Sequence, residues 1–267
     1  MGSIMLKPKG PVGIMVEAEV ISPAAFAGRS REEIEQLLVW QGPVQMPISE
    51  FFEVIVEAGG NGTPEDTSII IDGDVDRVKH IGHGMKAGRI EINGSAGMHI
   101  GSEMAGGTIL VRGNAGSWAG MEMKGGLLQI QGDAGDHVGC VYRGSWRGMS
   151  GGKILIEGDA RSQLGGGMTG GEIQVGKDVE NFCGIRQSGG LIIVKGNAVR
   201  GVGAEMTGGT IAVCGRIKQL SPGFVEAGSE DNPKLGENPL AGKFTRLSGD
   251  YAISKNPKGV LYAGQGW

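Results

Sequence analysis

Apolar and small residues recur in a fixed order between Gly88 and Gly215. This order begins at a series of anchoring glycines, each the second residue of a Gly-Gly or, at Gly88, an Ala-Gly pair. The later anchors are Gly107, Gly126, Gly152, Gly171, Gly190 and Gly209. Successive anchors are separated by 19, 19, 26, 19, 19 and 19 residues. The stretch is therefore an internal repeat that carries one seven-residue insertion.

Each repeat places aliphatic residues two and four positions after its anchoring glycine, among mixed and mostly polar neighbours. The first column is Ile90, Ile109, Leu128, Ile154, Ile173, Ile192 and Ile211. The second is Ile92, Val111, Ile130, Ile156, Val175, Val194 and Val213. A period of two is typical of a short, half-buried strand. Small or aliphatic residues return eight and twelve positions after the anchor, and methionine returns sixteen positions after it at Met104, Met123, Met168 and Met206.

A 19-residue unit with one strand cannot bury its apolar side alone, but stacked copies can, because each coil hydrogen-bonds to the next. We therefore predict an all-β fold, a right-handed parallel β-helix (β-solenoid) with 19-residue rungs. At ~4.8 Å a rung, about seven rungs make a core roughly 35 Å long. The glycines would turn corners at positive φ and allow backbones to approach closely.

The chain divides into three predicted segments: residues 1–66 as an N-terminal α/β cap, 67–220 as the β-helix and 221–267 as an extended C-terminal tail. In the cap, residues 12–20 alternate like a strand, and Ser30 and Glu33 have the spacing of a capping box before a helix over 31–38. Residues 48–56 predict a strand, or a short helix running into one, and 59–64 a loop. A separate functional domain is the alternative, but a solenoid end exposes unpaired backbone that needs a cover.

The tail loses the repeat after Pro222 and is rich in turn formers over residues 228–243. We expect an extended surface segment that is ordered by packing along a partner. Residues 251–253 and 260–262 predict a final hairpin.

Composition narrows the class of protein. Glycine is 53 of 267 residues, without the triplet period of collagen, and it falls at fixed places among aliphatic residues, unlike low-complexity disorder. The net charge of −4 argues against a nucleic-acid partner. No apolar run is long enough to span a bilayer, and Lys7 and Lys9 interrupt the N-terminal apolar stretch that a signal peptide needs. Three cysteines form no disulfide framework, so we expect a soluble, cytoplasmic protein.

Histidines form the first candidate site. His80 and His83 have a two-ligand spacing but no cysteine or acidic partner nearby in the sequence, which favours a loop over a metal site. His99 and His137 lie eleven residues after their anchors, with Trp118 at the same position of the repeat between them. We interpret this column as stacked rings, continued by Phe182, that serve either core packing or docking.

Polar and acidic residues form two further columns. Seven positions after the anchor stand Ser95, Asn114, Asp133, Asp159, Asp178 and Asn197. Residues of this kind after glycine commonly bond their own backbone in turns, and a cation site is the alternative. Glu103, Glu122 and Glu205 share another position, for which a paired-carboxylate hydrolase is the less favoured interpretation. Cys183 occupies an inward position and predicts a core residue. Without a CxxC pair, we expect no iron–sulfur or zinc site. We assign no catalytic, cofactor-binding or metal-binding residue to this chain.

The insertion between Gly139 and Gly151 is the strongest local sign of a binding face, because insertions in repeat proteins form loops on one face. It contains Tyr142, Arg143, Trp146 and Arg147, residue types that are enriched in interface cores. We predict an interface formed by these four residues and Trp118, with an ordinary surface loop as the alternative.

The glycine pattern also resembles a known family. The segments Gly97-Met-His-Ile-Gly-Ser-Glu-Met-Ala-Gly-Gly107 and Gly116-Ser-Trp-Ala-Gly-Met-Glu-Met-Lys-Gly-Gly126 resemble the GXGXG domain of glutamate synthase. They are more similar to the C subunit of formylmethanofuran dehydrogenase and to its relative, the C subunit of the bacterial formyltransferase/hydrolase complex. The lead-in at residues 41–53 and the tail at 242–244 also look like the dehydrogenase subunit.

This resemblance implies a non-catalytic scaffold subunit of a hetero-oligomeric complex that reduces CO2 with a ferredoxin-type electron donor and forms formylmethanofuran in methanogenesis. It implies partner subunits that hold a tungsten- or molybdenum-pterin, a dinuclear metal in an amidohydrolase-like subunit, and iron–sulfur clusters in ferredoxin-like subunits. The alternatives are the scaffold C subunit of the bacterial complex and a free-standing glutamate-synthase-type module. A chain that starts at Met1 with a cap of its own disfavours the last.

Overall fold

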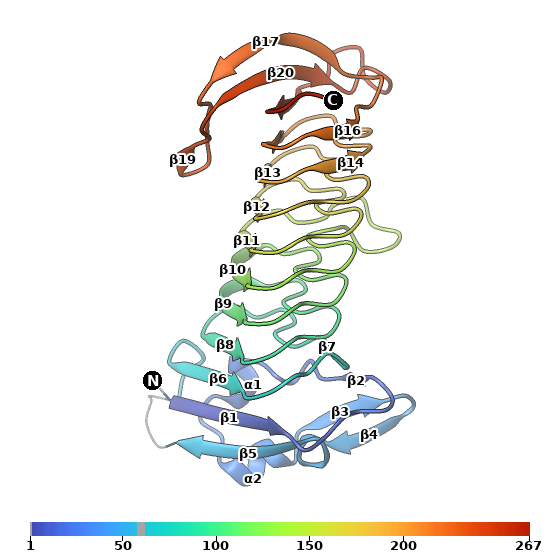
Figure 1. Ribbon diagram of the computed structural model, residues 1–267. Coiled ribbons are helices and arrows are strands. Elements are labelled where there is room, and N and C mark those ends of the chain that lie inside the picture. The colour runs from blue at the N-terminus through green and yellow to red at the C-terminus, as the bar shows by residue number, and fades with distance from the viewer. Residues whose placement is uncertain (1, 58–61) are drawn as a thin grey trace.

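The computed structural model describes residues 2–57 and 62–267. Residues 1 and 58–61, which belong to the predicted cap and its loop, lie outside the described residues. Strands predominate, three short helices occur among the described residues, and one 13-stranded sheet runs the length of the molecule (Figure 1). The expected all-β class is confirmed.

The repeats supply the middle of this sheet, where neighbouring strands pair in parallel and in sequence order. These strands are β6 (Thr67–Ile71), β8 (Arg89–Ile92), β9 (Ala105–Val111), β10 (Gly125–Ile130), β11 (Lys153–Ile156), β12 (Glu172–Val175), β13 (Leu191–Val194) and β15 (Thr210–Val213). Ile109 pairs with Ile90 and with Leu128, each 19 residues away. Leu128 pairs with Ile154 across the insertion, and Ile69 pairs with Ile90 across the predicted longer first turn.

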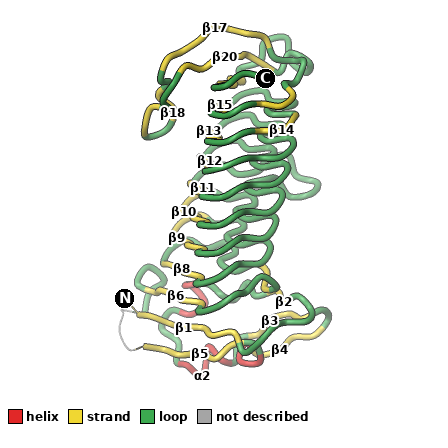
Figure 2. The backbone as a smooth tube through the Cα atoms, in the orientation of Figure 1, coloured by secondary structure: helices red, strands yellow, loops and turns green. Residues whose placement is uncertain are grey.

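The predicted inward columns form the core. Every residue of the two aliphatic columns is at most 2% exposed. A further column is joined by single parallel bridges, which run from Val75 through five residues to Ala198. Turns and loops make up most of each repeat, as Figure 2 shows. Buried side chains and backbone bonds between turns, such as that from the N–H of Gly120 to the carbonyl of Ile100 at 2.8 Å, hold the repeats together. The anchoring glycines all have φ between 80° and 84°, a region that favours glycine.

The N-terminal end covers the first repeat (Figure 1). Strand β1 (Gly2–Pro8), which the sequence pattern did not predict, pairs in parallel with β6 and antiparallel with β5 (Phe52–Glu57). The remaining elements are α1 (Pro23–Phe26), α2 (Arg31–Glu35), η1 (Ile48–Glu50), and a small sheet of β2 (Val16–Glu17), β3 (Leu38–Gln41), β4 (Val44–Pro47) and β7 (Val78–Lys79).

Two predictions in this end need correction. The capping box of Ser30 and Glu33 is confirmed, but the helix ends at Glu35 because Leu38 already begins β3. The early strand predicted over 12–20 is only Val16–Glu17, held between β3 and β7. The short helix running into a strand over residues 48–56 is confirmed as η1 and β5.

The C-terminal end continues the sheet. Strand β21 (Gly259–Ala263) pairs in parallel with β15, followed by β20 (Lys243–Gly249) and the edge strand β17 (Val225–Asp231). The short pairs are β14 (Ala198–Arg200) with β16 (Ile217–Gln219), and β18 (Lys234–Leu235) with β19 (Asn238–Pro239). The predicted strand at residues 251–253 is wrong, because these residues form the turn between β20 and β21.

The C-terminal segment also packs on its own chain. Phe244 is buried with Ala212 and Tyr262, and Glu237 lies 3.0 Å from the Nζ atom of Lys153 on β11. Packing of residues 221–267 along a partner stays a prediction.

Candidate functional site

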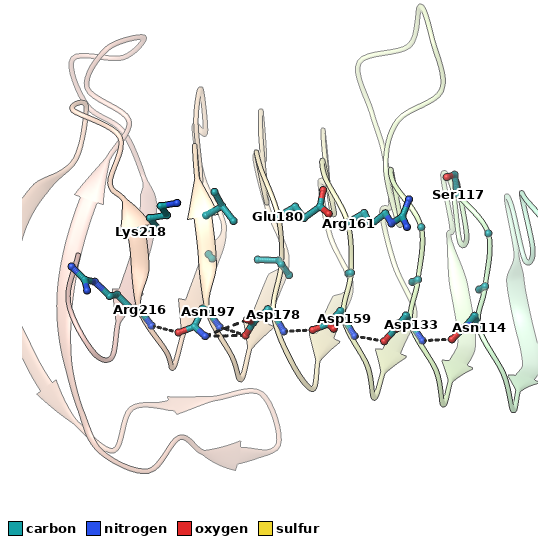
Figure 3. A pocket seen from close by; sticks show the side chains of 18 residues that line it. Asn114, Ser117, Asp133, Asp159, Arg161, Asp178, Glu180, Asn197, Arg216 and Lys218 are labelled. Atoms are coloured by element: carbon teal, nitrogen blue, oxygen red, sulfur yellow. Dashed lines mark hydrogen bonds between the residues drawn. The ribbon is translucent and has the colours of Figure 1, made fainter.

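A groove of about 1120 Å³ runs along one side of the repeats (Figure 3). Its floor is the column of small residues Ala115, Ala134, Ala160, Val179 and Ala198. Along one wall lie Asn114, Asp133, Asp159, Asp178, Asn197 and Arg216, while Ser117, Arg161, Glu180 and Lys218 lie along the other (Figure 3). Six successive repeats therefore contribute to one continuous surface.

The first wall is a hydrogen-bonded ladder. The backbone N–H of Asp159 donates to Oδ1 of Asp133 at 2.8 Å, and the N–H of Asp178 donates to Oδ1 of Asp159 at 2.9 Å. The same contact joins Asn197 to Asp178 at 2.7 Å and Arg216 to Asn197 at 2.9 Å. The predicted turn role of this column thus needs correction, because each side chain bonds the backbone of the next repeat rather than its own.

The glycines of this wall make room for the ladder. A Cβ atom on Gly158 would collide with Oδ1 of Asp133, and one on Gly196 would collide with Oδ1 of Asp178. At Gly158 and Gly196, close approach rather than a positive φ requires glycine, whereas Lys177 takes the same place before Asp178. Among the described residues, no three His, Cys, Asp or Glu side chains are grouped as metal ligands. The polar side chains of this wall therefore link successive repeats by hydrogen bonds.

A second column lies on the turns that follow the groove. The rings of His80 and His99 stack with centroids 4.6 Å apart, those of His99 and Trp118 are 6.0 Å apart, and those of Trp118 and His137 are 4.1 Å apart. We call these four residues the ring column. The predicted order of His99, Trp118 and His137 is confirmed, and His80, which the sequence pattern assigned to a loop, begins the column.

The continuation to Phe182 needs correction. Gln163 occupies the position between His137 and Phe182, and the ring of Phe182 instead lies 5.7 Å from the guanidinium of Arg200. The column position has φ near 60° in every repeat, from His80 at 63° to Gly201 at 68°. The stacked rings therefore sit on backbone that favours glycine.

The imidazoles of the ring column are neutral at pH 7. Burial lowers the pKa of His99 to about 4 and also lowers the pKa values of His80 and His137. The Nδ1 atoms of all three are buried and have no hydrogen-bond partner among the described residues. His83 differs, because its Nδ1 lies 2.9 Å from Oγ of Ser102.

The insertion loop, residues 141–148, projects from the middle of the stack and appears as the pale green loop in Figure 1. Its base is held by bonds from the N–H of Tyr142 to Glu122 at 3.0 Å and from the N–H of Gly148 to the carbonyl of Gly167 at 2.8 Å. The side chains of Tyr142 and Trp146 are 54% and 80% exposed. The guanidinium of Arg186 lies 6.0 Å from the Trp146 ring.

The predicted interface residues lie in one region, because the loop begins four residues after His137, the last ring of the column that includes Trp118. Arg143 and Arg147 are exposed on the loop. No contact with a partner tests the interface of Tyr142, Arg143, Trp146, Arg147 and Trp118, which stays a prediction.

The remaining acidic candidates have partners within the chain. Glu103 pairs with Lys124 at 3.0 Å and Glu205 with Arg186 at 2.8 Å, while Glu122 accepts the N–H of Tyr142. The stacked glutamates are thus engaged separately, which does not favour a carboxylate pair that shares a proton.

The thiols are protonated structural groups. Cys183 is buried as predicted, and burial raises its pKa to about 12. Burial raises the pKa of Cys140 to about 11. Since the thiolate is the reactive form, neither buried cysteine is set up as a nucleophile.

Within the part of the chain that the structure describes, no helix is long and apolar enough to cross a membrane. No family model matches the chain.

Curated relatives match over the whole chain. The C subunit of molybdenum-containing formylmethanofuran dehydrogenase 1 from Methanosarcina barkeri is 62% identical over 262 residues, 98% of this chain and 86% of the relative. The C subunit of tungsten-containing formylmethanofuran dehydrogenase 2 from Methanothermobacter thermautotrophicus is 56% identical over 266 residues, 100% of this chain and 97% of the relative.

A solved structure has the same fold. A chain of the formyltransferase/hydrolase complex (FhcABCD) from Methylorubrum extorquens, determined in complex with methylofuran, superposes with a TM-score of 0.82 at 29% identity. The match covers 97% of this chain and 98% of that chain. The whole-length identity to the two curated relatives shows that this chain belongs to the family of formylmethanofuran dehydrogenase C subunits.

Proposed function

We propose that this chain is a non-catalytic scaffold subunit of a formylmethanofuran dehydrogenase complex, which reduces CO2 and forms formylmethanofuran with a ferredoxin-type electron donor. The observation that carries this proposal is the 62% identity over 98% of the chain to a C subunit of that enzyme. The chain's own chemistry supports a scaffold role, because its ladder carboxylates bind backbone and its buried thiols are protonated.

The scaffold we propose is a right-handed parallel β-helix with 19-residue rungs over residues 67–220. The constant 19-residue offset between paired strands and the bridged column from Val75 to Ala198 support it. Residues 1–66 would cap one end, supported by the pairing of β1 with β6, and residues 221–267 would form the other end and pack on a partner.

The partners we propose are a tungsten- or molybdenum-pterin subunit, an amidohydrolase-like subunit with a dinuclear metal, and ferredoxin-like subunits with iron–sulfur clusters. Relatives whose names contain molybdenum and tungsten support the first of these. We place the complex in the cytoplasm, where the three free cysteines would remain reduced. The proposed interface comprises Tyr142, Arg143, Trp146, Arg147 and Trp118, supported by the high exposure of Trp146.

A second candidate is the C subunit of a bacterial formyltransferase/hydrolase complex. The TM-score of 0.82 to a chain of that complex favours it, but the identity is 29%, about half that to the dehydrogenase subunits.

The test is affinity purification of the tagged chain from its native host, with gel filtration, identification of the bound proteins and metal analysis. We expect co-elution with a pterin-containing subunit and an amidohydrolase-like subunit in one large species. Elution as a lone chain, or with a formyltransferase and no pterin subunit, would contradict the dehydrogenase assignment.

A further inference from the structure

The ring column and the insertion loop form one continuous surface. The N–H of Cys140, at the start of the loop, donates to the carbonyl of His137, the last ring of the column, at 3.2 Å. The N–H of Tyr142 donates to Glu122, which lies four residues after Trp118. The loop therefore stands directly on the turns that carry the rings.

This surface exposes large apolar groups at its loop end. The side chain of Trp146 is 80% exposed, which is the highest value among the large hydrophobic residues described, and that of Tyr142 is 54% exposed. A partner that covered this indole would remove a large apolar surface from water. Tryptophan and tyrosine side chains also contribute much of the binding energy at protein interfaces. Among the described residues, the ring contact of Trp146 is with the guanidinium of Arg186, at 6.0 Å.

The loop also carries two positively charged side chains that have no partner among the described residues. Among residues 2–57 and 62–267, the guanidinium groups of Arg143 and Arg147 make neither a hydrogen bond nor an ion pair. Other arginines between repeats do find carboxylates, as Arg112 does with Glu91 and Arg186 does with Glu205. Two free guanidinium groups beside an exposed indole are complementary to carboxylates set in an apolar surface.

The ring column adds flat contact area to the loop. Trp118 and His137 hold φ values of 67° and 63°, a conformation that costs free energy for any residue except glycine. Glycine occupies the same position at Gly201, so the turn itself does not require a ring. The stacked rings are half-buried and neutral, which suits them to contact an uncharged part of a partner.

We propose that the ring column and the insertion loop together form a docking surface for a partner subunit, which places carboxylates against Arg143 and Arg147 and buries Trp146. This inference rests on the proposed function, because it requires that the chain work within a hetero-complex. It adds the chemistry of the partner surface, which is acidic around an apolar centre.

The test uses the intact complex and measures the dissociation constant between this chain and its remaining subunits. We expect Trp146→Ala to weaken binding about tenfold or more, as removal of an interface anchor does. The double reversal Arg143→Glu with Arg147→Glu should weaken it by a similar factor. Binding of the unaltered chain should weaken with added salt, whereas binding of the double variant should not.

Matched controls lie at the N-terminal end and directly after β13, outside both this surface and residues 221–267. Trp40→Ala removes a ring on β3 that is 46% exposed, and Arg29→Glu with Lys195→Glu reverses two exposed charges. These variants should bind like the unaltered chain. All variants alter exposed side chains, so their urea midpoints should match that of the unaltered chain, which separates lost docking from lost folding.

The outcomes separate the two proposals. Assembly that is unaffected by the Trp146 and arginine variants overturns the docking surface and leaves the proposed function standing. Failure of the unaltered chain to assemble overturns both. A homodimer of the isolated chain that the same variants abolish would replace the partner subunit with a second copy and overturn the inference. A second readout is hydrogen exchange at residues 141–148, which should slow in the complex.

Discussion

The two long surfaces of the stack are built from the same repeats but treat their polar groups in opposite ways. In the groove, Asp133 and Asp159 each accept a backbone N–H from the next repeat, so the polar wall is satisfied within the chain. On the turns that follow, His99 and His137 leave buried Nδ1 atoms without a partner among the residues that the structure describes, and Arg143 leaves its guanidinium unpaired there. The polar groups of the groove wall thus bond within the chain, whereas the guanidinium of Arg143 on the insertion loop has no partner among the described residues.

The difference comes from the type of polar group that each position repeats. A short carboxylate or amide reaches the backbone of the next repeat at less than 3 Å and forms a ladder whatever its charge, since Asn114 and Asn197 fit as well as Asp133. A ring can stack on its neighbour but cannot satisfy its own nitrogen in doing so. Stacked repeats therefore satisfy the polar groups of the groove wall and leave the buried Nδ1 atoms of the ring column without a partner among the described residues.

Truncation of a core side chain should lower the free energy of unfolding more than any change on either face. Ile109→Ala removes a fully buried side chain from the column that the two faces share, and it should lower the free energy of unfolding by about 2–5 kcal/mol through cavity formation. Urea melts followed by circular dichroism measure this loss. A loss below that of any surface variant would show that the inward assignment is wrong.

The ladder gives the next effect. Asp159→Ala removes the acceptor for the N–H of Asp178 and should lower the free energy of unfolding by about 1 kcal/mol. Asp159→Asn keeps the acceptor and removes one of three neighbouring negative charges, so it should be neutral or stabilising. Equal urea midpoints for the two variants would contradict a ladder held by the side-chain oxygen.

The ring column should make the folding stability depend on pH. Because the pKa of His99 falls from its ordinary 6.5 to about 4 on folding, the unfolded chain binds more protons between these values. Stability should therefore fall as the pH is lowered from about 6.5 to about 4. His99→Gln, which copies the glutamine that Gln163 places at this position with a φ of 62°, should remove about 1 kcal/mol of that fall once solvent screening is allowed for.

Thermal melts of both chains across this pH range make the comparison, in which carboxylates common to both titrate equally. Parallel stability curves for the unaltered chain and the His99→Gln variant would show that this imidazole is not held neutral by burial.

The smallest effect belongs to an exposed ion pair between repeats. Arg112→Ala breaks the 2.9 Å contact with Glu91, and its cost should be no more than about 1 kcal/mol because both groups reach solvent. A loss as large as that of Ile109→Ala would mean that this outer surface, rather than the core columns, holds the repeats together.

The core could be predicted from the sequence because burial acts at fixed positions of every repeat. Each residue of the two aliphatic columns is buried, and the 26-residue spacing correctly located the insertion. Gln187 takes the place of methionine in its repeat, sixteen residues after Gly171. It is fully buried, and its Nε2 donates to the carbonyls of Gly189 and Gly190. Counting positions from the anchoring glycine predicts the burial of this polar side chain.

Other features could not be predicted because they depend on contacts between repeats or with the N-terminal end, which the pattern within one repeat does not contain. Strand β1 reads as a short apolar stretch between polar residues, and only its pairing with β6 makes it a strand. His80 joins the ring column because the two extra residues of the first repeat precede it, so counting from the strand misplaces it. The partner of each ladder side chain depends on the stacking offset, whereas turn propensity describes a residue and its own neighbours.

We propose that this chain supports the chemistry of a formylmethanofuran dehydrogenase without performing it. The most direct measurement is a CO2-dependent methanofuran formylation assay with a low-potential electron donor, performed on the isolated chain, on the purified complex, and on the complex from which this chain has been removed. We expect no turnover by the isolated chain, full turnover by the complex, and loss of turnover together with loss of assembly in the depleted complex. Turnover by the isolated chain, or an intact and active complex without it, would rule out a non-catalytic scaffold role.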